Sequence, residues 1–274
     1  MIRRALFLAS LLTLTPIAFA RIEEETIPAP AAPPAGSTAP TRASKEKLSY
    51  SEVNVEGPYL AITFDDGPST RNTPKLLDLL AAKHIKGTFF VLGECVAANP
   101  EILKRIAAEG HEIGNHTWTH ASLAKSSDEK IRGELQRAEK QIIALTGMKP
   151  KLMRPPYGAM SARQRKWVHD EFGYNIVLWD VDPLDWKEPG VNVVANRIIK
   201  EARPGSIILS HDIHAPTVEA MPEVLDTLLA KGFKFVTVSE LIAIDKGGSR
   251  PEPTKPAAKA ESEAPAATRT EGIR

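Results

Sequence analysis

The chain has 274 residues, of which 42% are hydrophobic and 25% are charged, and its formal net charge at pH 7 is +1. These values are typical of a globular protein of one or two domains and exclude a chain that is disordered throughout. The near-neutral charge, without any clustered basic run, argues against a nucleic-acid-binding protein. Cys95 is the only cysteine, so no internal disulfide can form and stability must come from a hydrophobic core.

Residues 1–20 have the features of a secretory signal peptide. Arg3 and Arg4 precede an apolar run at 5–14, and Ala18 and Ala20 provide the small residues of a cleavage site. The apolar run is shorter than the roughly 20 residues that span a bilayer, which favours cleavage over a membrane anchor. We therefore expect a secreted or periplasmic protein with no stable membrane span after cleavage.

Two segments of low complexity flank the part of the chain that can fold. Residues 21–47 are rich in proline, alanine, serine and threonine, which predicts a disordered linker. Residues 246–274 contain mainly small, charged and proline residues without an aromatic side chain, which predicts a disordered tail. The catalytic domain is therefore expected at 48–245.

Strand-like and helical patterns alternate within this predicted domain. The strands are expected at 59–64, 88–92, 112–114, 151–153, 175–179, 206–209 and 233–236. The helices are expected at 73–83, 101–109, 128–146, 161–171, 191–202, 217–231 and 239–244. Such alternation predicts an α/β fold in which crossover helices join parallel strands, and six or seven units favour a complete or incomplete barrel over an open sheet.

Five short motifs each follow one of these expected strands. They are T-F-D-D-G-P-S at 63–69, H-T-W-T-H at 116–120, R-P-P-Y-G at 154–158, D-P-L-D-W at 182–186 and L-S-H at 209–211. Because the carboxyl ends of the strands in such barrels face one shared site, the polar residues of the motifs are expected to converge. Together they provide the groups needed for metal-assisted hydrolysis.

The first two motifs suggest a metal site. Asp65 and Asp66 stand before Gly67 and Pro68, where they either form a simple turn or divide two roles, cation binding and proton abstraction. His116 and His120 are four residues apart, so one helical turn would place both imidazoles on one side. Two histidines and one carboxylate form a three-ligand set that leaves the fourth position of a zinc ion open for water.

The other three motifs contain groups that could control proton transfer in the reaction. Arg154 stands at a strand end, where it can pair with a catalytic carboxylate and hold it ionised. Asp182 and Asp185 follow one strand, and His211 follows another. A carboxylate beside a histidine raises the pKa of that histidine and makes it a proton donor near neutral pH. Amide hydrolysis needs such a donor because an amine leaves poorly unless it is protonated.

Several other residues have simpler explanations. His111 is expected outside the site, and His214 either lines the cleft or lies in a solvated loop. Trp118 either flanks the substrate or packs against the protein. Cys95 is expected to be a small buried thiol rather than a nucleophile, because no motif histidine is near it in the sequence.

In this order, the five motifs resemble those of the NodB-type polysaccharide deacetylases, carbohydrate esterase family 4, over about residues 58–244. The resemblance implies a distorted (β/α) barrel and hydrolysis of N-acetyl groups on amino-sugar polymers. It also implies a divalent metal, zinc or alternatively cobalt. By motif, it implies that Asp66, His116 and His120 are the metal ligands, that Asp65 is the general base, and that Arg154 orients this base.

The resemblance also implies roles for the remaining motif residues. His211 would be the general acid, with its pKa set by Asp185. The backbone N–H of Tyr157 would stabilise the oxyanion, where donors act on developing charge. Trp186 and Leu209 would form the pocket for the acetyl methyl group. The roles of Asp182 and His214 are left open.

Two other functions remain compatible with these motifs. An O-acetyl esterase acting on xylan would use the same groups but depend less on the acid, because an alkoxide leaves more readily than an amine. A non-catalytic glycan-binding domain would be expected to lack a base or a ligand, and none is missing here. The partner is expected to be an N-acetylated polysaccharide, either peptidoglycan or chitin oligomers. The sequence does not indicate an oligomeric state.

Overall fold

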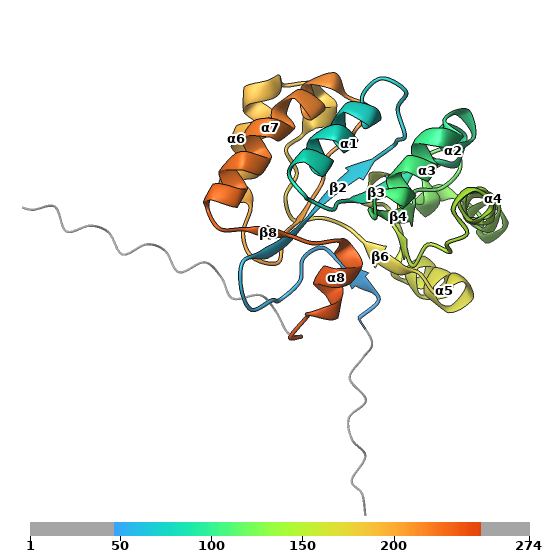
Figure 1. Cartoon of the computed structure of the whole chain (residues 1–274). Helices are drawn as coiled ribbons and strands as arrows, with labels where there is room; N and C mark the ends of the chain where they lie inside the picture. The colour runs from blue at the N-terminus through green and yellow to red at the C-terminus, as the bar shows by residue number, and fades with distance from the viewer. Residues whose placement is uncertain (1–46, 248–274) are drawn as a thin grey trace, which may run out of the picture. The chain divides into compact units, whose positions relative to one another are not determined.

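Parallel β-strands form the centre of the protein, and helices surround them (Figure 1). The computed structural model describes residues 47–247. Its strands are β1 (Ser49–Tyr50), β2 (Tyr59–Asp65), β3 (Thr88–Val91), β4 (Glu112–Asn115), β5 (Leu152–Met153), β6 (Asn175–Val177), β7 (Ile207–Ile208) and β8 (Lys234–Phe235). They pair in the order β1-β6-β5-β4-β3-β2-β7, and β8 also pairs with β2.

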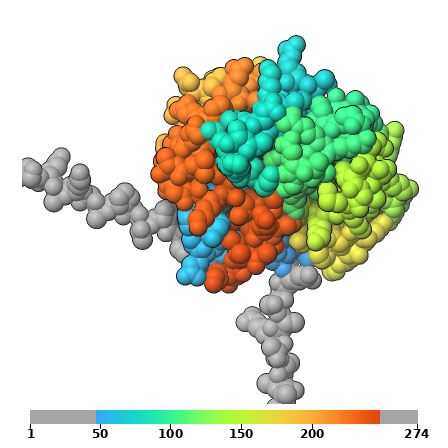
Figure 2. All heavy atoms as spheres, viewed as in Figure 1, coloured from blue at the N-terminus to red at the C-terminus, as the bar shows by residue number. Residues whose placement is uncertain are grey.

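Eight α-helices accompany these strands in the described residues. They are α1 (Thr73–Ala82), α2 (Gly93–Ala98), α3 (Pro100–Ala108), α4 (Asp128–Thr146), α5 (Ala162–Phe172), α6 (Val191–Glu201), α7 (Ala215–Ala230) and α8 (Val238–Ala243). Short 3-10 helices occur at η1 (Leu123–Lys125), η2 (Pro156–Gly158) and η3 (Asp185–Lys187). In the space-filling view the helical segments cover most of the face turned to the reader (Figure 2).

Helix α4 shows how local sequence sets the limits of an element. The Ser127 side chain accepts a hydrogen bond from the backbone N–H of Lys130, which satisfies one of the free donors at the helix start. Acidic residues Asp128 and Glu129 lie in the first turn, where they favour the positive end of the helix dipole. Gly147 ends the helix with φ 72°, a left-handed conformation that glycine adopts without a steric cost. The observed limits coincide with those predicted.

Strand β2 lies between two hydrophobic layers. Six of its seven residues are buried, as expected for a strand covered on both faces. Leu60, Ile62 and Phe64 belong to one cluster with the inner faces of α1 and α7. Ala61, which points the other way, belongs to a second cluster that includes Leu241 of α8. Helix α8 therefore packs against the side of β2 opposite to α1 and α7.

The predicted α/β fold is confirmed, with two elements that were not predicted and a sheet that does not close through a continuous ladder. Strand β1 and helix α2 were not among the expected elements. The pairing path runs from β1 to β7 without a continuous ladder between its two ends. However, an isolated parallel bridge joins Val181, just after β6, to Ile208 of β7. A second isolated bridge, which is antiparallel, joins Glu52, shortly after β1, to Ser206, just before β7. The two ends of the sheet therefore meet through single bridges, in agreement with an incomplete, distorted barrel.

The predicted signal peptide lies outside the described residues, as does most of the predicted linker and tail. Lys246 and Gly247, the first residues of the predicted tail, are described. The backbone N–H of Lys246 donates to the carbonyl of Asn54 at 2.9 Å, and the Asn54 amide donates to the carbonyl of Gly247 at 2.7 Å. Among residues 47–247, none of the helices combines the length and apolar character required to cross a membrane.

Candidate active site

A cavity of about 420 Å³ contains residues from all five motifs. It lies at the carboxyl ends of the strands, where β2, β4 and β7 each end at a motif. Convergence of the motifs was expected from the alternation of strands and helices, and the structure shows it. The lining residues are Asp65, Asp66, His116, His120, Pro155, Tyr157, Trp179, Asp182, Trp186, Leu209 and His211.

Asp66, His116 and His120 form a group that fits a divalent metal ion. One donor atom from each lies within 4.8 Å of the others. The Nε2 atoms of His116 and His120 are 3.3 and 3.4 Å from Asp66 Oδ1. Within residues 47–247, this buried oxygen has no hydrogen-bond partner, which is unusual unless a ligand completes it. His116 Nδ1 lies 2.7 Å from the carbonyl of Arg154, so its Nε2 is the nitrogen available to a metal.

The electrostatics of this group favour the protonation states that metal ligands need. Burial opposes ionisation of Asp66, but the adjacent imidazoles, His116 first and then His120, outweigh it and lower the pKa of Asp66 to about 2. Burial, followed by the neighbouring His116, lowers the pKa of His120. A charged carboxylate and neutral imidazoles are the forms that bind a metal.

The two histidines do not lie on a helix, so that part of the sequence prediction is wrong. Strand β4 ends at Asn115, and residues 116–120 form a loop in which Thr117 and His120 have φ values of 75° and 59°. Asn115 Oδ1 accepts the Thr117 N–H at 2.8 Å, and Thr117 Oγ1 accepts the His120 N–H at 3.1 Å. These bonds replace the helical ones and still place the two rings 5.0 Å apart.

Asp65 and Arg154 form a buried ion pair, as expected from their positions at two strand ends. Arg154 Nη1 donates to Asp65 Oδ1 and to Thr63 Oγ1, both at 2.7 Å, and the side chain of Arg154 is 0% exposed. The other carboxylate oxygen, Asp65 Oδ2, is 3.8 Å from His116 Nε2. The pair therefore leaves one Asp65 oxygen directed toward the proposed metal group.

His211 and Asp185 form a second pair on another wall of the cavity. His211 Nδ1 is 2.8 Å from Asp185 Oδ1, and the His211 backbone N–H donates to Asp185 Oδ2 at 2.8 Å. Thr217 Oγ1 donates to the same oxygen at 2.9 Å. Burial opposes protonation of His211, but the hydrogen bond and charge of Asp185 outweigh it and raise the pKa of His211 to about 9. With this pKa, the imidazole of His211 carries an additional proton at neutral pH.

Three further predicted residues line the cavity in different ways. Tyr157 is 69% exposed and has φ 61°, and its ring centroid is 4.6 Å from that of His120. Trp186 is 51% exposed, whereas Leu209 is buried. The cavity therefore has two accessible aromatic side chains and an apolar wall, a combination that suits a sugar ring with an acyl substituent.

Three residues whose roles the sequence did not decide have distinct positions in the structure. Asp182 lines the cavity, and its Oδ1 accepts the N–H of Leu184 at 2.8 Å. His214 is not among the lining residues, and its Nδ1 is 3.7 Å from Glu188. Trp118 is buried, with the guanidinium of Arg137 over its ring at 3.7 Å, so it packs against the protein.

The positions of two other predicted residues agree only in part with expectation. His111 lies outside the cavity, as expected, and its Nδ1 accepts the N–H of Gly87 at 3.1 Å. Cys95 lies on α2 and is half-buried rather than fully buried. Burial raises the pKa of its thiol, which disfavours a nucleophilic role.

Sequence reasoning missed Asp212, which directly follows His211. Its side chain is fully buried, Thr73 Oγ1 donates to its Oδ2, and its Oδ1 has no hydrogen-bond partner in residues 47–247. Burial raises the pKa of Asp212 to about 7. A side chain at Gly67 would overlap this carboxylate, so the loop after Asp66 depends on glycine there. The sequence contains one signal that could have identified Asp212. It is a carboxylate that directly follows a motif histidine at the end of a buried strand.

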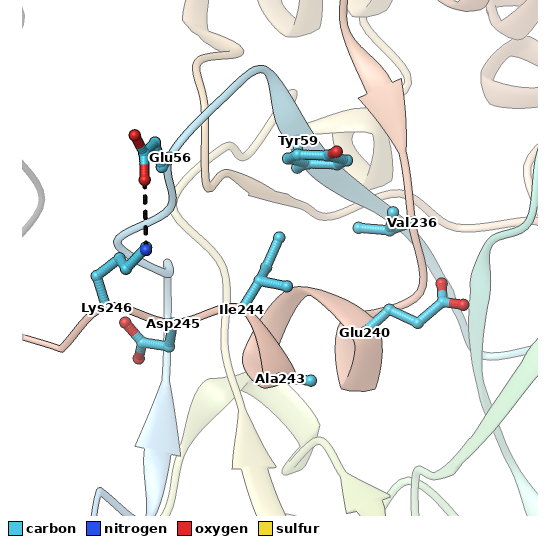
Figure 3. A pocket seen from close by; sticks show the side chains of 8 residues that line it. All are labelled: Glu56, Tyr59, Val236, Glu240, Ala243, Ile244, Asp245 and Lys246. Atoms are coloured by element: carbon cyan, nitrogen blue, oxygen red, sulfur yellow. Dashed lines mark ion pairs between the residues drawn. The ribbon is translucent and has the colours of Figure 1, made fainter.

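A second cavity contains none of the motif residues. It has about 730 Å³ and is lined by residues of β2, α8 and the segments beside them (Figure 3). Tyr59, Val236 and Ile244 form its apolar part, and Glu56 pairs with Lys246 at 3.3 Å at its edge. Its carboxylates, Glu56, Glu240 and Asp245, do not form a candidate metal-binding group, and the one such group in residues 47–247 lies in the motif cavity. The motif cavity is therefore the better candidate for the active site.

Comparison with known proteins identifies relatives of this chain. A family model described as polysaccharide deacetylase matches residues 52–177. The peptidoglycan-N-acetylglucosamine deacetylase of Bacillus cereus is 39% identical over 209 residues, which cover 73% of this chain and 74% of that protein. The peptidoglycan-N-acetylglucosamine deacetylase PgdA of Listeria monocytogenes is 41% identical over 182 residues, which cover 66% of this chain. The chain spans only 38% of the length of PgdA.

A solved structure shows the same similarity in three dimensions. It is the Bc1960 peptidoglycan N-acetylglucosamine deacetylase, which superposes with a TM-score of 0.69 at 36% sequence identity. The match covers 75% of this chain and 96% of the solved one. The similarity therefore extends over nearly the whole of an independently determined domain.

Proposed function

Because the chain belongs to the NodB-type polysaccharide deacetylases of carbohydrate esterase family 4, we propose that it hydrolyses the N-acetyl groups of N-acetylglucosamine residues in a polysaccharide and releases acetate. The main supporting observation is that one cavity contains a metal-binding group, a buried Asp–Arg pair and a buried His–Asp pair. These are the groups needed for metal-assisted amide hydrolysis.

In this proposal Asp66, His116 and His120 hold the divalent metal, zinc or alternatively cobalt. Their nitrogen and oxygen donors suit several divalent ions, so ligand type alone does not select one. When bound, such an ion would polarise the acetyl carbonyl and make water a stronger nucleophile near neutral pH. The unpartnered Oδ1 of Asp66 and the free Nε2 of His116 support this assignment.

Asp65 acts as the general base and Arg154 as its partner. The guanidinium donates to one oxygen of Asp65 at 2.7 Å, and this charge-assisted hydrogen bond fixes the direction of the carboxylate. The second oxygen lies 3.8 Å from His116 Nε2, so it faces the place where the attacking water would stand. Asp65 would take the proton that this water loses as its oxygen bonds to the acetyl carbon.

His211 acts as the general acid. Its Nε2 carries the proton that the amide nitrogen needs when its bond to the acetyl carbon breaks. Asp185 accepts a hydrogen bond from the other ring nitrogen, Nδ1, at 2.8 Å, and so orients the ring and favours its protonated form. The products are acetate and a free amino sugar. The backbone N–H of Tyr157 would donate to the developing oxyanion, while Trp186 and Leu209 would contact the acetyl methyl group.

The buried His211–Asp185 pair favours an amide over an ester as the bond that is cleaved. An alkoxide leaves without much help, whereas an amine must be protonated. A xylan O-acetyl esterase is therefore the second candidate. A glycan-binding domain without activity is the third, and the presence of every proposed catalytic group argues against it.

Peptidoglycan is the proposed polymer, with chitin oligomers as the alternative. Both curated relatives described above are named for peptidoglycan. The signal-like sequence at 1–20 agrees with a secreted or periplasmic enzyme that would meet this polymer outside the cytoplasm.

Acetate release tests the proposal directly. Purified protein is incubated with peptidoglycan, with N-acetylglucosamine oligomers and with O-acetylated xylan, each with a chelator and after zinc is added back. We expect release from peptidoglycan that the chelator stops and zinc restores. Faster release from the oligomers would make chitin oligomers the substrate in place of peptidoglycan. Faster release from xylan would make the protein an O-acetyl esterase in place of an N-deacetylase. No release from any substrate by folded, zinc-loaded protein would favour the glycan-binding domain.

A further inference from the structure

The loop at residues 116–120, here called the ligand loop, holds two of the three proposed metal ligands, and its own backbone is neither helix nor strand. Thr117 and His120 have positive φ values of 75° and 59°, which are unfavourable for residues other than glycine. Such a backbone persists only when its surroundings hold it in place. The contacts of the ligand loop therefore matter for the geometry of the metal group.

Helix α2 holds the carbonyl groups of the ligand loop. The Gly93 N–H donates to the Thr117 carbonyl at 2.9 Å, and the Glu94 N–H donates to the Trp118 carbonyl at 3.2 Å. A side chain at residue 93 would overlap the Trp118 ring, so glycine is what permits this close approach.

Glu134 of α4 holds the N–H groups of the same loop. Its Oε2 accepts the backbone N–H of Trp118 at 2.9 Å and that of Thr119 at 2.8 Å. Its Oε1 accepts the Thr119 hydroxyl at 2.8 Å. One carboxylate thus satisfies three donors between the two histidines, and bonds to an ionised acceptor are stronger than bonds between neutral groups.

Other residues of α4 support the same contact. Arg137, one turn after Glu134, places its guanidinium 3.7 Å from the centroid of the Trp118 ring. The carbonyl of Leu135 accepts the side-chain amide of Asn115, the residue before His116, at 2.9 Å. Helix α4, which has 19 residues, therefore contacts the ligand loop through Glu134 and Arg137 and the residue before the loop through Leu135.

We propose that Glu134 is a positioning residue that sets the affinity of the site for its metal, an inference that rests on the metal site proposed above. Glu134 is not among the residues that line the cavity, so it acts through the ligand loop and not on substrate. Its three hydrogen bonds hold His116 and His120 at the separation that a metal requires. Without them, metal binding must also order the loop, and this cost lowers the affinity.

The test measures zinc affinity in competition with a chromophoric chelator. The proteins are the wild type, Glu134→Ala, Glu134→Gln and the matched control Glu129→Gln, which changes an exposed glutamate on the same helix. We expect about tenfold weaker binding for Glu134→Ala, in the range seen when outer-shell partners of metal ligands are lost. Glutamine keeps an oxygen for the two N–H groups but loses the charge, so we expect about threefold weaker binding. The control should bind as the wild type does.

Two further measurements separate positioning from general destabilisation. Thermal unfolding of each metal-free protein shows whether the variants fold. The visible absorption bands of the cobalt-loaded proteins report ligand geometry, and we expect them to change in the Glu134 variants but not in Glu129→Gln. If Glu134→Ala does not fold, Glu134→Gln decides the question.

The possible outcomes are distinct. Wild-type zinc affinity and an unchanged cobalt spectrum in Glu134→Gln, and in any folded Glu134→Ala, would overturn the role of Glu134 while leaving the metal site intact. A folded wild-type protein that binds neither zinc nor cobalt would overturn the metal site, and with it this inference.

Discussion

Carboxylate side chains lie at both ends of the strands, but the hydrogen bonds that they accept differ between the two ends. At the amino end, Glu112 of β4 accepts hydrogen bonds from Thr88 Oγ1 at 3.1 Å, from the Ser239 N–H at 3.0 Å and from the Ser239 hydroxyl. At the carboxyl end, Asp66 and Asp212 each have a buried oxygen that no group in residues 47–247 satisfies. Glu112 is therefore fully satisfied by protein donors, whereas Asp66 and Asp212 each keep an acceptor that a ligand could satisfy. The two unpartnered buried atoms near Glu112, Glu109 Oε2 and His111 Nε2, are instead 3.8 Å from each other.

Backbone conformation shows the same contrast. Seven non-glycine residues between 47 and 247 have positive φ. Six of them lie in the loops that follow the strands at the motif cavity, and only His84 lies elsewhere: Asp66, Thr117, His120, Tyr157, Leu184 and Glu188. Strained residues of this kind cluster where function requires a geometry that packing alone does not select. Backbone strain, more than polarity, therefore distinguishes the two ends.

The largest effect is expected from Asp65→Asn at the carboxyl end. The amide cannot take a proton, and the Arg154 charge loses its buried partner. We expect kcat to fall by about 10³-fold or more, within the range of general-base effects. Zinc should stay bound, as metal analysis of the variant would show. Full activity in this variant would remove Asp65 from the mechanism.

His211→Ala should separate amide from ester hydrolysis. We expect about a 10²-fold loss of kcat on an N-acetylated substrate, because the departing amine loses its proton donor. The loss on an activated acetate ester should be much smaller. Parallel kinetics on both substrates check this, and equal losses on the two would contradict the role of His211 as the acid.

Asp185→Asn should move the pH dependence without removing the acid. The raised pKa of His211, about 9, keeps it protonated below that pH, so activity should decline only as the pH rises through this value. Loss of the Asp185 charge lowers the pKa of His211, and the alkaline decline in kcat/KM should move to lower pH. Profiles of both proteins measure the shift, and a decline that stays in place would contradict the coupling.

Glu112→Ala at the amino end should affect stability alone. It leaves the donors of Thr88 and Ser239 without their acceptor, at a cost of about 2 kcal/mol in the free energy of unfolding. Denaturant unfolding measures this loss, while kcat/KM of the folded variant should equal that of the wild type. A large loss of activity in folded protein would show that the two ends are not independent.

The order of strands and helices could be predicted because apolar periodicity is local. The limits of α4 and the position of Asp65 and Arg154 at strand ends followed from residues within a few positions. The pairing of these two residues then followed from the rule that strand ends meet. The same reasoning brought both histidines and Asp66 to one place.

The conformation of the ligand loop could not be predicted because its partners are distant in sequence. A spacing of four residues suits a helical turn, but the backbone of 116–120 bonds to Gly93 and Glu94 on one side and to Glu134 on the other. None of these three residues belongs to a sequence motif that would indicate its role. Glu134 looked like any other charged residue on an amphipathic helix, so only the fold identifies it.

The buried guanidinium of Arg154 links the orientation of Asp65 to three strands. Besides bonding Asp65, it donates from Nη2 to the carbonyl of Leu178 at 2.9 Å and from Nε to that of Val177 at 3.4 Å. Arg154 follows β5, which neighbours β6, whereas β3 and β4 separate β5 from β2 in the pairing order. Its bonds to Thr63 and Asp65 of β2 therefore reach across the interior. The orientation of Asp65 thus depends on β2, β5 and β6 together, so a local rearrangement of any of these three strands would disturb the base.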